Sequence, residues 1–385
     1  MRIAVYTDDE FSDYEGGIYA RCAFTLFVDR LSERVDEMVV LGRLRQGGEI
    51  ARYRLADQIR FVGLPYYESL GSPLHAGRGF AHSIRSFWRI LDGVDGCWLL
   101  GPHPFSVAFA LLAILRRKRI VLGVRQDLPE YARTRHPDRI GVMAIAWMLE
   151  GAYRLLARRF ATVVVGPALA HNYRHSARVL EIAVSLVEPQ QIVDPAKAAE
   201  RSYAGPLTIL SVGRVDKEKN PLMLAHVLDA LVRDGGDFHL VSIGEGTLVS
   251  ALEDRLSSLG LRERSSLRGY VEQAALPEVY RQSHFLLITS HTEGLPQVVL
   301  EAFAAGLPVV STDVGGVADA VGSAAIFVEP EDTAGAANAI RRLADDASLR
   351  GSVIAAGHSY IKAHTIDAEI DRVAELLKSE IATER

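Results

Sequence analysis

The sequence predicts an α/β protein built from two doubly wound domains, each with a parallel sheet. Three observations support this prediction. The chain has 385 residues, which at about 150 residues per domain corresponds to two domains. Short runs of Val, Ile and Leu alternate with amphipathic segments throughout, as in parallel strands covered by helices on both faces. With 49% hydrophobic and 24% charged residues, the composition excludes a fibrous or disordered protein.

The apolar runs predict strands, and the segments between them have the spacing of amphipathic helices. In the first half, strands are expected at 3–6, 37–41, 96–100, 120–124 and 162–165, and helices at 20–32, 79–91, 106–115 and 140–157. In the second half, strands are expected at 207–212, 239–243, 285–288, 308–311 and 325–328. After Thr333 the pattern is helical to the end of the chain.

The stretch 188–206 separates the two halves, because it contains three prolines and little periodicity. We therefore expect domains at 1–190 and 191–365, with a terminal helix at 366–385 that packs back on the first domain. Doubly wound domains bind ligands beyond the carboxyl ends of their strands. Two such domains facing a central cleft place the active site between them.

The two cysteines, Cys22 and Cys97, are too few for a disulfide framework, and no Cys/His cluster has the spacing of a zinc site. A reducing cytoplasmic setting is therefore expected. The apolar run 2–6 is too short for a signal peptide. The uncharged stretch 97–115 is interrupted by Gly101-Pro102-His103-Pro104, so it is expected to form strand, loop and helix and not to span a membrane.

The loop after strand 207–212 contains the first chemical signal, Gly213-Arg214 followed by Lys219-Asn220-Pro221. Gly213 lets a ligand approach the backbone, and Arg214 and Lys219 place two cations at the strand edge. A forked guanidinium beside a point-like ammonium suits a diphosphate. Taken alone, the loop could also be a surface turn with solvated charges.

A second signal follows strand 285–288, where Glu293-Gly294-Leu295-Pro296 leads into a helix. Pro296 suits a first helical turn, and the backbone N–H groups of Gly294 and Leu295 form an anion site at a helix amino terminus. Glu301 lies in the helix among apolar residues. A carboxylate there can accept hydrogen bonds from two vicinal sugar hydroxyls.

Together these motifs resemble a known family. Residues 205–330 look like the carboxy-terminal domain of a family-4 retaining glycosyltransferase of the GT-B fold, among the glycosyl transferases group 1. The matching landmarks, in order, are Gly213-Arg214 with Lys219-Asn220, Gly244-Glu245-Gly246, Gly269-Tyr270-Val271, Glu293-Gly294 with Glu301-Ala302, the run Gly306-Leu307-Pro308-Val309-Val310-Ser311, and Gly315-Gly316.

The resemblance implies a nucleotide-sugar site in the second half. In that family Arg214 and Lys219 bind the donor diphosphate, Glu301 holds the ribose hydroxyls and Glu293 lies near the transferred sugar. Arg214, Lys219 and Glu293 are thus the expected catalytic residues. The remaining expected donor-binding residues of this half are Gly213, Gly244, Tyr270, Val271, Gly294 and Leu295. No cofactor and no metal are expected.

The first half resembles the family less and is the expected acceptor-binding domain. Gly16-Gly17 matches a glycine pair that lets the backbone approach the acceptor, at Gly16, and the donor phosphate, at Gly17. The family's active-site histidine should follow strand 120–124, but this chain has Arg125-Gln126-Asp127 there. Arg125 occupies the position where the family has its histidine, and Asp127 is the second candidate for that role. His103 is a loop histidine that could supply an imidazole.

The resemblance implies transfer of a hexose-type sugar from a nucleotide diphosphate sugar to a hydroxyl acceptor, with retention, in cell-envelope or polysaccharide glycan synthesis. Two alternatives remain open: a non-catalytic GT-B partner protein, motivated by the missing histidine, and a sugar-nucleotide epimerase. A dehydrogenase is disfavoured, because Gly244-x-Gly246 lacks the third glycine of a dinucleotide-binding turn.

Charge is distributed unevenly between the halves. Residues 1–190 carry 25 Lys and Arg against 20 Asp and Glu, a formal +5, which leaves 18 against 28, or −10, for residues 191–385. Basic residues gather at 116–119 and 154–159, and segment 79–91 mixes arginines with Phe80, Phe87 and Trp88. Such a face suits an anionic membrane surface and a lipid-linked acceptor, although a solvated surface and a sugar or small-molecule acceptor remain open. Nucleic acid is not an expected partner.

Overall fold

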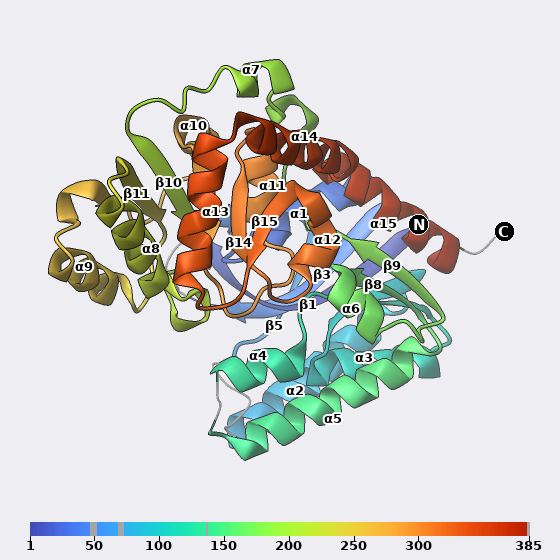
Figure 1. Cartoon of the computed structure of the whole chain (residues 1–385). Helices are drawn as coiled ribbons and strands as arrows, with labels where there is room; N and C mark the ends of the chain where they lie inside the picture. Colours follow the sequence, from blue (N-terminus) through green and yellow to red (C-terminus); the bar gives the residue numbers. More distant parts are fainter. Residues whose placement is uncertain (47–51, 68–72, 136–137, 383–385) are drawn as a thin grey trace. The chain divides into compact units, whose positions relative to one another are not determined.

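The computed structural model describes residues 1–46, 52–67, 73–135 and 138–382, and the chain separates into two compact units (Figure 1). One unit contains Met1–Val165, Leu169–Val184 and Asp367–Arg385; the other contains Gly166–Ala168 and Ser185–Ile366. The continuous part of the second unit therefore begins at Ser185 and not at residue 191. Its first residues already bond within it, since the Val187 carbonyl accepts a hydrogen bond from the Ile366 N–H at 2.8 Å.

The first unit is organised around a nine-stranded sheet. Its parallel part has the order β5-β3-β1-β6-β7-β8-β9, so the order reverses between β1 and β6. The strands are β1 (Arg2–Tyr14), β3 (Glu37–Arg45), β5 (Arg60–Pro65), β6 (Gly96–Gly101), β7 (Arg119–Val124), β8 (Ala161–Val165) and β9 (Arg178–Ile182). The central strands are buried, as their runs of Val, Ile and Leu predict.

Strand β1 continues well beyond the expected end at residue 6. Its register with β3 shifts between Tyr6 and Glu10, and the strand then turns back through Glu15 and Gly16, both with positive φ. The antiparallel strands β2 (Gly17–Ala20) and β4 (Tyr53–Arg54) extend the sheet there. The polar sequence after Tyr6 concealed this hairpin, because only the apolar part of the strand is recognisable from composition.

Helices cover the first sheet and complete its core. They are α1 (Phe24–Ser32), α2 (Pro73–Ile90), α3 (Pro104–Leu115), α4 (Leu128–Arg135), α5 (Ile140–Ala157) and α6 (Pro167–Asn172). Phe87 of α2 and Phe109 of α3 are fully buried and stack with ring centroids 4.1 Å apart. This pair fixes the two helices against the same part of the core.

The terminal helix α15 (Ile366–Ile381) packs within the first unit from Asp367 onward. Its Ile381 fills the space above Gly96 of β6, where a Cβ would lie 2.6 Å from the isoleucine side chain. Asp371 pairs with Arg34 at 2.8 Å, after the end of α1. The carboxyl-terminal helix α15 thus completes the hydrophobic core of the first unit.

The second unit has a six-stranded, fully parallel sheet in the order β12-β11-β10-β13-β14-β15. The strands are β10 (Leu207–Val212), β11 (Phe238–Ile243), β12 (Ser265–Leu267), β13 (Phe285–Ile288), β14 (Val309–Thr312) and β15 (Ala325–Val328). Strands β10, β11 and β12 follow one another toward one edge of the sheet, and β13, β14 and β15 follow one another toward the other edge. The strand order therefore reverses between β10 and β13. This is the order of a dinucleotide-binding doubly wound sheet.

Two groups of helices cover this sheet (Figure 1). Helices α8 (Pro221–Arg233), α9 (Val249–Ser258) and α13 (Thr333–Asp345) form one group, and α10 (Leu276–Gln282), α11 (Gln297–Ala304) and α14 (Ala347–Ala363) form the other. The short helices α7 (Pro195–Ala199) and α12 (Val317–Val321) complete the unit. The predicted fold class, two doubly wound α/β domains, is confirmed.

Candidate functional site

The glycine-rich loops of the second unit meet at the carboxyl edge of its sheet. Gly213 follows β10 and donates to the Ile243 carbonyl at 2.9 Å, while Gly244 follows β11 and donates to the Gly269 carbonyl at 2.7 Å. Gly244 has φ of 140°, and a Cβ there would lie 1.8 Å from the carbonyl oxygen of Gly213. Only glycine fits, because any side chain would displace the backbone of the neighbouring loop.

Arg214 is anchored by two carboxylates and remains open to solution. Its Nη1 lies 3.0 Å from Asp216 Oδ2 and its Nη2 lies 2.5 Å from Glu218 Oε1, yet 54% of the side chain is exposed. Asp216 is itself held by Thr247, whose N–H and hydroxyl donate to it at 2.9 and 2.8 Å. The guanidinium is therefore positioned before any ligand arrives.

Lys219 and Glu293 form an ion pair across the switch point. The Lys219 Nζ lies 2.6 Å from Glu293 Oε1, and the Ser290 hydroxyl donates to the same oxygen at 2.5 Å. The Thr289 hydroxyl donates to the Lys219 and Asn220 carbonyls at 2.9 and 3.0 Å. These bonds join the loop after β10 to the loop after β13, so two predicted residues far apart in sequence are brought together.

The segment 294–296 lies just before α11. The helix begins at Gln297, and Pro296 is its N-cap with extended backbone, so Pro296 precedes the first turn in which the sequence placed it. Leu295 is buried. Gly315, after β14, has φ of 63°, and a Cβ there would lie 1.7 Å from the Glu293 carbonyl oxygen. A close backbone approach therefore fixes the loop that carries Glu293.

Glu301 lies on α11 in a different environment from the other predicted acids. Tyr280 of α10 donates its hydroxyl to Glu301 Oε2 at 2.6 Å. Burial raises the pKa of Glu301, and the bond from Tyr280 opposes this rise. Both residues line a pocket of the second unit. Its other lining residues include Leu186, Val187, Gln191, Gln273, Leu276 and Ala304, and do not include Arg214, Lys219 or Glu293.

Tyr270 and Val271 follow β12, directly after Gly269. The Gly269 carbonyl accepts the Gly244 N–H, so this loop adjoins the one after β11. Tyr270 is 42% exposed, one of the larger exposed apolar side chains of the described residues. An exposed ring beside a glycine-lined strand edge offers a surface on which a flat base can stack.

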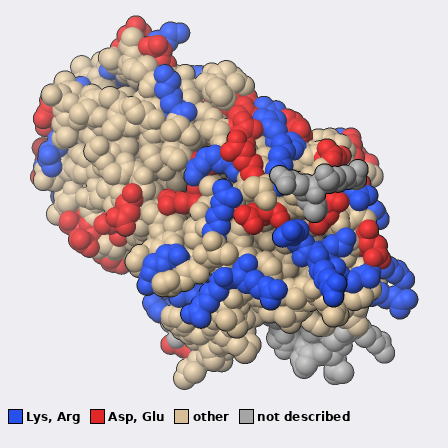
Figure 2. Space-filling view, turned by 90° about the vertical axis from the view of Figure 1, so that its right-hand side faces the viewer, with Lys and Arg blue, Asp and Glu red and all other residues tan. Residues whose placement is uncertain are grey.

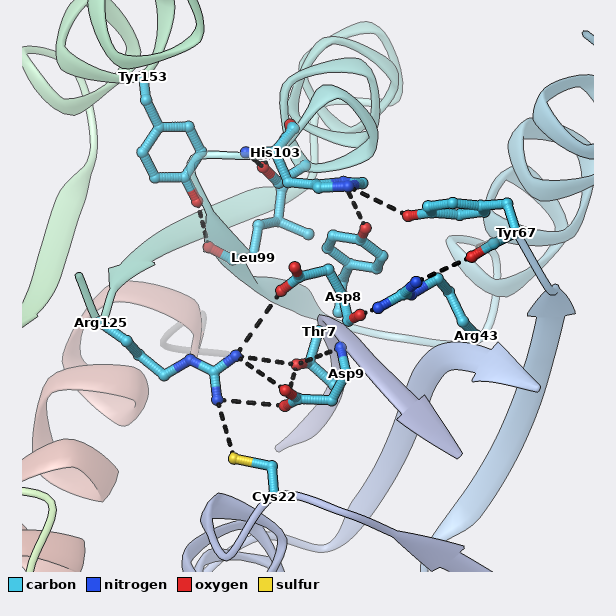
Figure 3. A network of polar contacts seen from close by, with 12 residues as sticks. Thr7, Asp8, Asp9, Cys22, Arg43, Tyr67, Leu99, His103, Arg125 and Tyr153 are labelled. Atoms are coloured by element: carbon cyan, nitrogen blue, oxygen red, sulfur yellow. Dashed lines mark hydrogen bonds and ion pairs between the residues drawn. The ribbon is translucent and has the colours of Figure 1, made fainter. Parts of the chain in front are cut away.

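A second polar cluster in the first unit lies on β1 where its register with β3 shifts after Tyr6, and just beyond the carboxyl end of β7 (Figure 3). Arg125 reaches both carboxylate oxygens of Asp9, at 3.1 and 3.3 Å, and lies 3.7 Å from Asp8. Thr7 donates to Asp9 at 2.6 Å. Burial alone would raise the pKa of Asp9, but Arg125 and Thr7 hold it below its usual value. Arg125, in the place where the family's histidine was expected, is thus committed to an ion pair.

His103 lies beside this cluster with both ring nitrogens engaged (Figure 3). The Tyr6 hydroxyl lies 2.8 Å from Nδ1 and the Tyr67 hydroxyl 3.1 Å from Nε2. Burial lowers the pKa of His103 to about 4, with Arg43 acting in the same direction and Asp8 against it. The imidazole is therefore neutral near pH 7, and it also caps α3 by accepting the Phe105 N–H at 3.3 Å.

The other acceptor-side residues lie apart from the ion pair of Asp9 and Arg125. Asp127 accepts the Glu130 N–H at 2.9 Å and the Asn172 side-chain N–H at 3.1 Å, so it stabilises the start of α4. Gly16 lies in the turn between β1 and β2, exposed, and a Cβ on it would meet nothing within 4 Å. Gly17 begins β2, where a Cβ would lie 2.9 Å from the Tyr19 ring.

Sequence reasoning missed several residues of these clusters. Asp8 and Asp9 were visible as polar residues directly after an apolar strand, which is a usable signal for a strand-edge site. Tyr67 and Tyr280 carried no such signal, because their partners lie on other elements. Among the described residues, no group of three or more His, Cys, Asp or Glu side chains could hold a metal ion.

Comparison with known proteins relates both the sequence and the fold to glycosyltransferases. Residues 193–360 match the family described as glycosyl transferases group 1. The 2-deoxystreptamine glucosyltransferase of Streptomyces kanamyceticus is 26% identical over 73% of this chain and 71% of its own length. The glycogen synthase of Mycobacterium tuberculosis is 32% identical, but the match spans only 39% of this chain and 36% of that protein.

Solved structures extend the similarity to nearly the whole chain. HepE from Anabaena, solved in complex with UDP, superposes with a TM-score of 0.71 over 98% of this chain and 100% of its own, at 16% identity. The same protein has been solved with UDP-glucose. At this identity the likeness shows the fold alone. Residues 193–360 therefore form a glycosyl transferases group 1 domain, in a chain with the GT-B fold.

Proposed function

We propose that this chain transfers a hexose-type sugar from a nucleotide diphosphate sugar to a hydroxyl acceptor, with retention of anomeric configuration. The observation that carries the proposal is the set of cations at the switch point of the second sheet, Arg214 and the Lys219–Glu293 pair. The glucosyltransferase relative and the UDP-glucose complex of HepE support a nucleotide-sugar donor. The proposal includes glycan synthesis, for which the glycogen synthase match offers support.

The placement of the two cations suits a diphosphate. Without donor, Arg214 is neutralised by Asp216 and Glu218, and Lys219 by Glu293. The carboxylates fix the positions of both cations, so a diphosphate can accept hydrogen bonds from the guanidinium and the ammonium with little reorganisation. We propose that these two side chains supply the charge that the leaving group needs and that no metal takes part.

The proposed reaction breaks the bond between the anomeric carbon and the phosphate oxygen, and the bonding pair leaves with the diphosphate. The acceptor oxygen forms its bond to the same carbon on the same face, and its proton passes to the departing phosphate. Glu293, fixed by Lys219 and Ser290, lies near the sugar and stabilises positive charge that develops on its ring. Glu301 accepts the ribose hydroxyls, with Tyr280 orienting its carboxylate.

We assign acceptor binding to the first unit, where the cluster around Asp9 and Arg125 lies at the strand edge that binds ligands in doubly wound sheets. In this assignment His103 is a neutral hydrogen-bonding group and not a general base, since burial lowers its pKa to about 4. Both cysteines are free thiols, which supports a reducing cytoplasmic location.

The donor assignment is tested by comparing Lys219→Ala with Lys217→Ala in transfer and donor-binding assays. Lys217 is exposed in the same short helical turn, so its replacement changes the net charge equally without touching Glu293. Loss of an interaction with developing charge lowers turnover by about 100-fold or more. We expect that loss for Lys219→Ala and near-normal rates for Lys217→Ala.

Equal rates in the two variants would refute the assignment. A panel of nucleotide sugars, screened by thermal shift, identifies the donor, because a ligand that binds the folded state raises the melting temperature. Proton NMR of the product reports the anomeric configuration. Conversion of the donor to its epimer without any acceptor would assign an epimerase instead, and donor binding with no turnover would assign a non-catalytic partner.

A further inference from the structure

Helix α5 presents large apolar side chains to solvent on one side. Its buried side consists of Ala146, Glu150, Tyr153 and Ala157, it packs against α3 and α4, and the Tyr153 hydroxyl donates to the Leu99 carbonyl of β6. The exposed fractions on its outer side are 84% for Ile140, 53% for Ile145, 52% for Trp147, 65% for Met148 and 65% for Leu155. Scattered apolar side chains are ordinary on a protein surface, but several on one helix mark a contact surface.

The neighbouring helix α3 continues this surface. It packs beside α5, and its outer residues Leu111 and Leu115 are 58% and 70% exposed. The helix carries no charged residue between Pro104 and Leu115. Below, the name apolar face denotes these seven side chains of α3 and α5: Leu111, Leu115, Ile140, Ile145, Trp147, Met148 and Leu155.

Basic side chains follow the carboxyl end of α3 and lie at both ends of α5. Arg116, Arg117, Lys118 and Arg119 follow α3, while Arg139 precedes α5 and Arg158 and Arg159 follow it. The one acid of α5, Glu150, is buried and paired with Arg154 at 2.8 Å. Arg116 is paired with Asp92, Lys118 donates to the Val94 carbonyl, and Asp138 is exposed beside Arg139. The exposed cations around the two helices are Arg117, Arg119, Arg139, Arg158 and Arg159. Figure 2 shows Lys and Arg side chains gathered next to a broad uncharged surface at the lower end of the view, where Figure 1 places α2, α3 and α5.

The aromatic residues that the sequence analysis associated with a basic face contribute little to this surface. Phe87 is fully buried in the core, and Trp88 is covered by Arg116, whose guanidinium lies 4.3 Å from the ring centroid. Phe80 alone of the three is exposed, at 39%. The structure therefore moves the candidate contact surface from α2 to α3 and α5.

We propose that the apolar face docks on an anionic lipid bilayer, with α5 lying in the headgroup region parallel to the membrane. Apolar side chains enter the boundary of the acyl chains while the flanking arginines contact lipid phosphates, as in interfacial helices. A second copy of the chain is a poorer occupant, because a twofold contact would bring each basic rim against the same rim of its partner.

Helix α5 is long and apolar enough to cross a membrane, the single such helix among the described residues. The buried side chains of α5 indicate that the helix lies on the membrane surface and does not cross the bilayer. Glu150 and Tyr153 are held in the first unit by Arg154 and the Leu99 carbonyl, and extraction of the helix would expose a charged group and an unpaired hydroxyl to hydrocarbon.

Vesicle flotation of the full chain tests the proposal. We expect binding to vesicles that contain phosphatidylglycerol and much weaker binding to pure phosphatidylcholine. Met148→Glu should weaken partitioning by about tenfold or more, since an apolar side chain is lost from the interface. The control Ser257→Glu alters the charge equally at an exposed position of α9 and should leave binding unchanged.

A second comparison isolates the charge contribution. Arg158→Glu should reduce binding to the anionic vesicles by about fivefold or more, given the usual contribution of one basic residue near such a surface. Arg233→Glu makes the same charge change in the second unit, on α8, and should have no such effect. Donor binding in solution should be unaltered in all four variants, so a failure here is distinguishable from a failure of the proposed transfer.

Tryptophan fluorescence of the wild type supplies a test in which binding itself is measured without a substitution. The three tryptophans are Trp88, Trp98 and Trp147; Trp98 is buried and Trp88 is covered by Arg116. Brominated acyl chains should therefore quench mainly Trp147, and Trp147→Phe should remove that quenching. Absence of binding to anionic vesicles, or equal binding of Met148→Glu, would overturn the proposal. A dimer that Met148→Glu dissociates, without vesicle binding, would assign the face to self-association.

Discussion

Replacement of Arg125 by methionine should destabilise the first unit by about 3 kcal/mol at neutral pH. The side chains of Arg125 and Asp9 are 24% and 18% exposed and are joined by two contacts, at 3.1 and 3.3 Å. Removing one partner of a buried pair leaves a charge without compensation and typically costs about 3–5 kcal/mol. The lower end applies here, because Thr7 still donates to Asp9 at 2.6 Å.

The pH dependence of this loss follows from the pKa of Asp9. In the wild type, Arg125 holds the folded pKa of Asp9 below its unfolded value. The ion pair therefore stabilises the first unit at pH values above the unfolded pKa of Asp9. This stabilisation is lost as the pH falls through the folded pKa. Without Arg125, burial raises the folded pKa of Asp9 above its unfolded value. The first unit then loses stability as the pH rises through that folded pKa. The difference between the two proteins should therefore be larger near pH 7 than near pH 4.

Urea unfolding followed by tryptophan fluorescence measures this difference in the right unit, since Trp88, Trp98 and Trp147 all belong to the first unit. Arg119→Met is the matched control at the opposite end of the same strand, where the side chain is exposed; it should change the unfolding free energy by less than about 0.5 kcal/mol. Combining Arg125→Met with Asp9→Asn should give a coupling of about 2 kcal/mol. A loss below about 1 kcal/mol that does not vary with pH would refute the reasoning.

Three further outcomes are expected. Tyr280→Phe removes the bond that opposes the raised pKa of Glu301, so the acid limit of donor binding, measured by calorimetry, should move to higher pH; an unchanged limit would separate Glu301 from the ribose. Gly244→Ala should abolish donor binding, because its Cβ would meet a backbone oxygen at 1.8 Å, whereas Gly235→Ala, at φ of 85° with no neighbour within 4 Å, should lose only about 1 kcal/mol of stability; similar donor affinities would contradict this. Leu377→Ala on α15, fully buried, should lower the unfolding free energy of the first unit by about 2–5 kcal/mol, and no shift in its fluorescence transition would mean that the helix is dispensable.

Most of the sheet framework was predictable from the sequence. Strands such as β6, β7, β10 and β13 are buried on both faces, so their apolar composition alone identifies them. Strands β5, β9 and β12 escaped prediction because they are only partly buried and their uninterrupted Val, Ile and Leu runs are short. The continuation of β1 into a hairpin was missed for the same reason.

The loops of the second unit were predictable because each follows its strand directly in the sequence. Arg214 and Lys219 come after β10 and Glu293 comes after β13, and the carboxyl ends of parallel strands share one edge. The sequence could therefore indicate that these residues approach one another. The Lys219–Glu293 contact at 2.6 Å and its bond from Ser290 needed the tertiary structure.

The order of residues along the chain thus determined the fold class and the edge of each sheet at which chemistry is placed. Only the tertiary structure decided which charges are paired and which apolar residues are exposed. Arg125 meets Asp9 across 116 positions of sequence, and α5 has the composition of a core helix although much of it faces solvent. The physical reason is that burial and pairing depend on neighbours brought by other elements, and local periodicity carries no information about those neighbours.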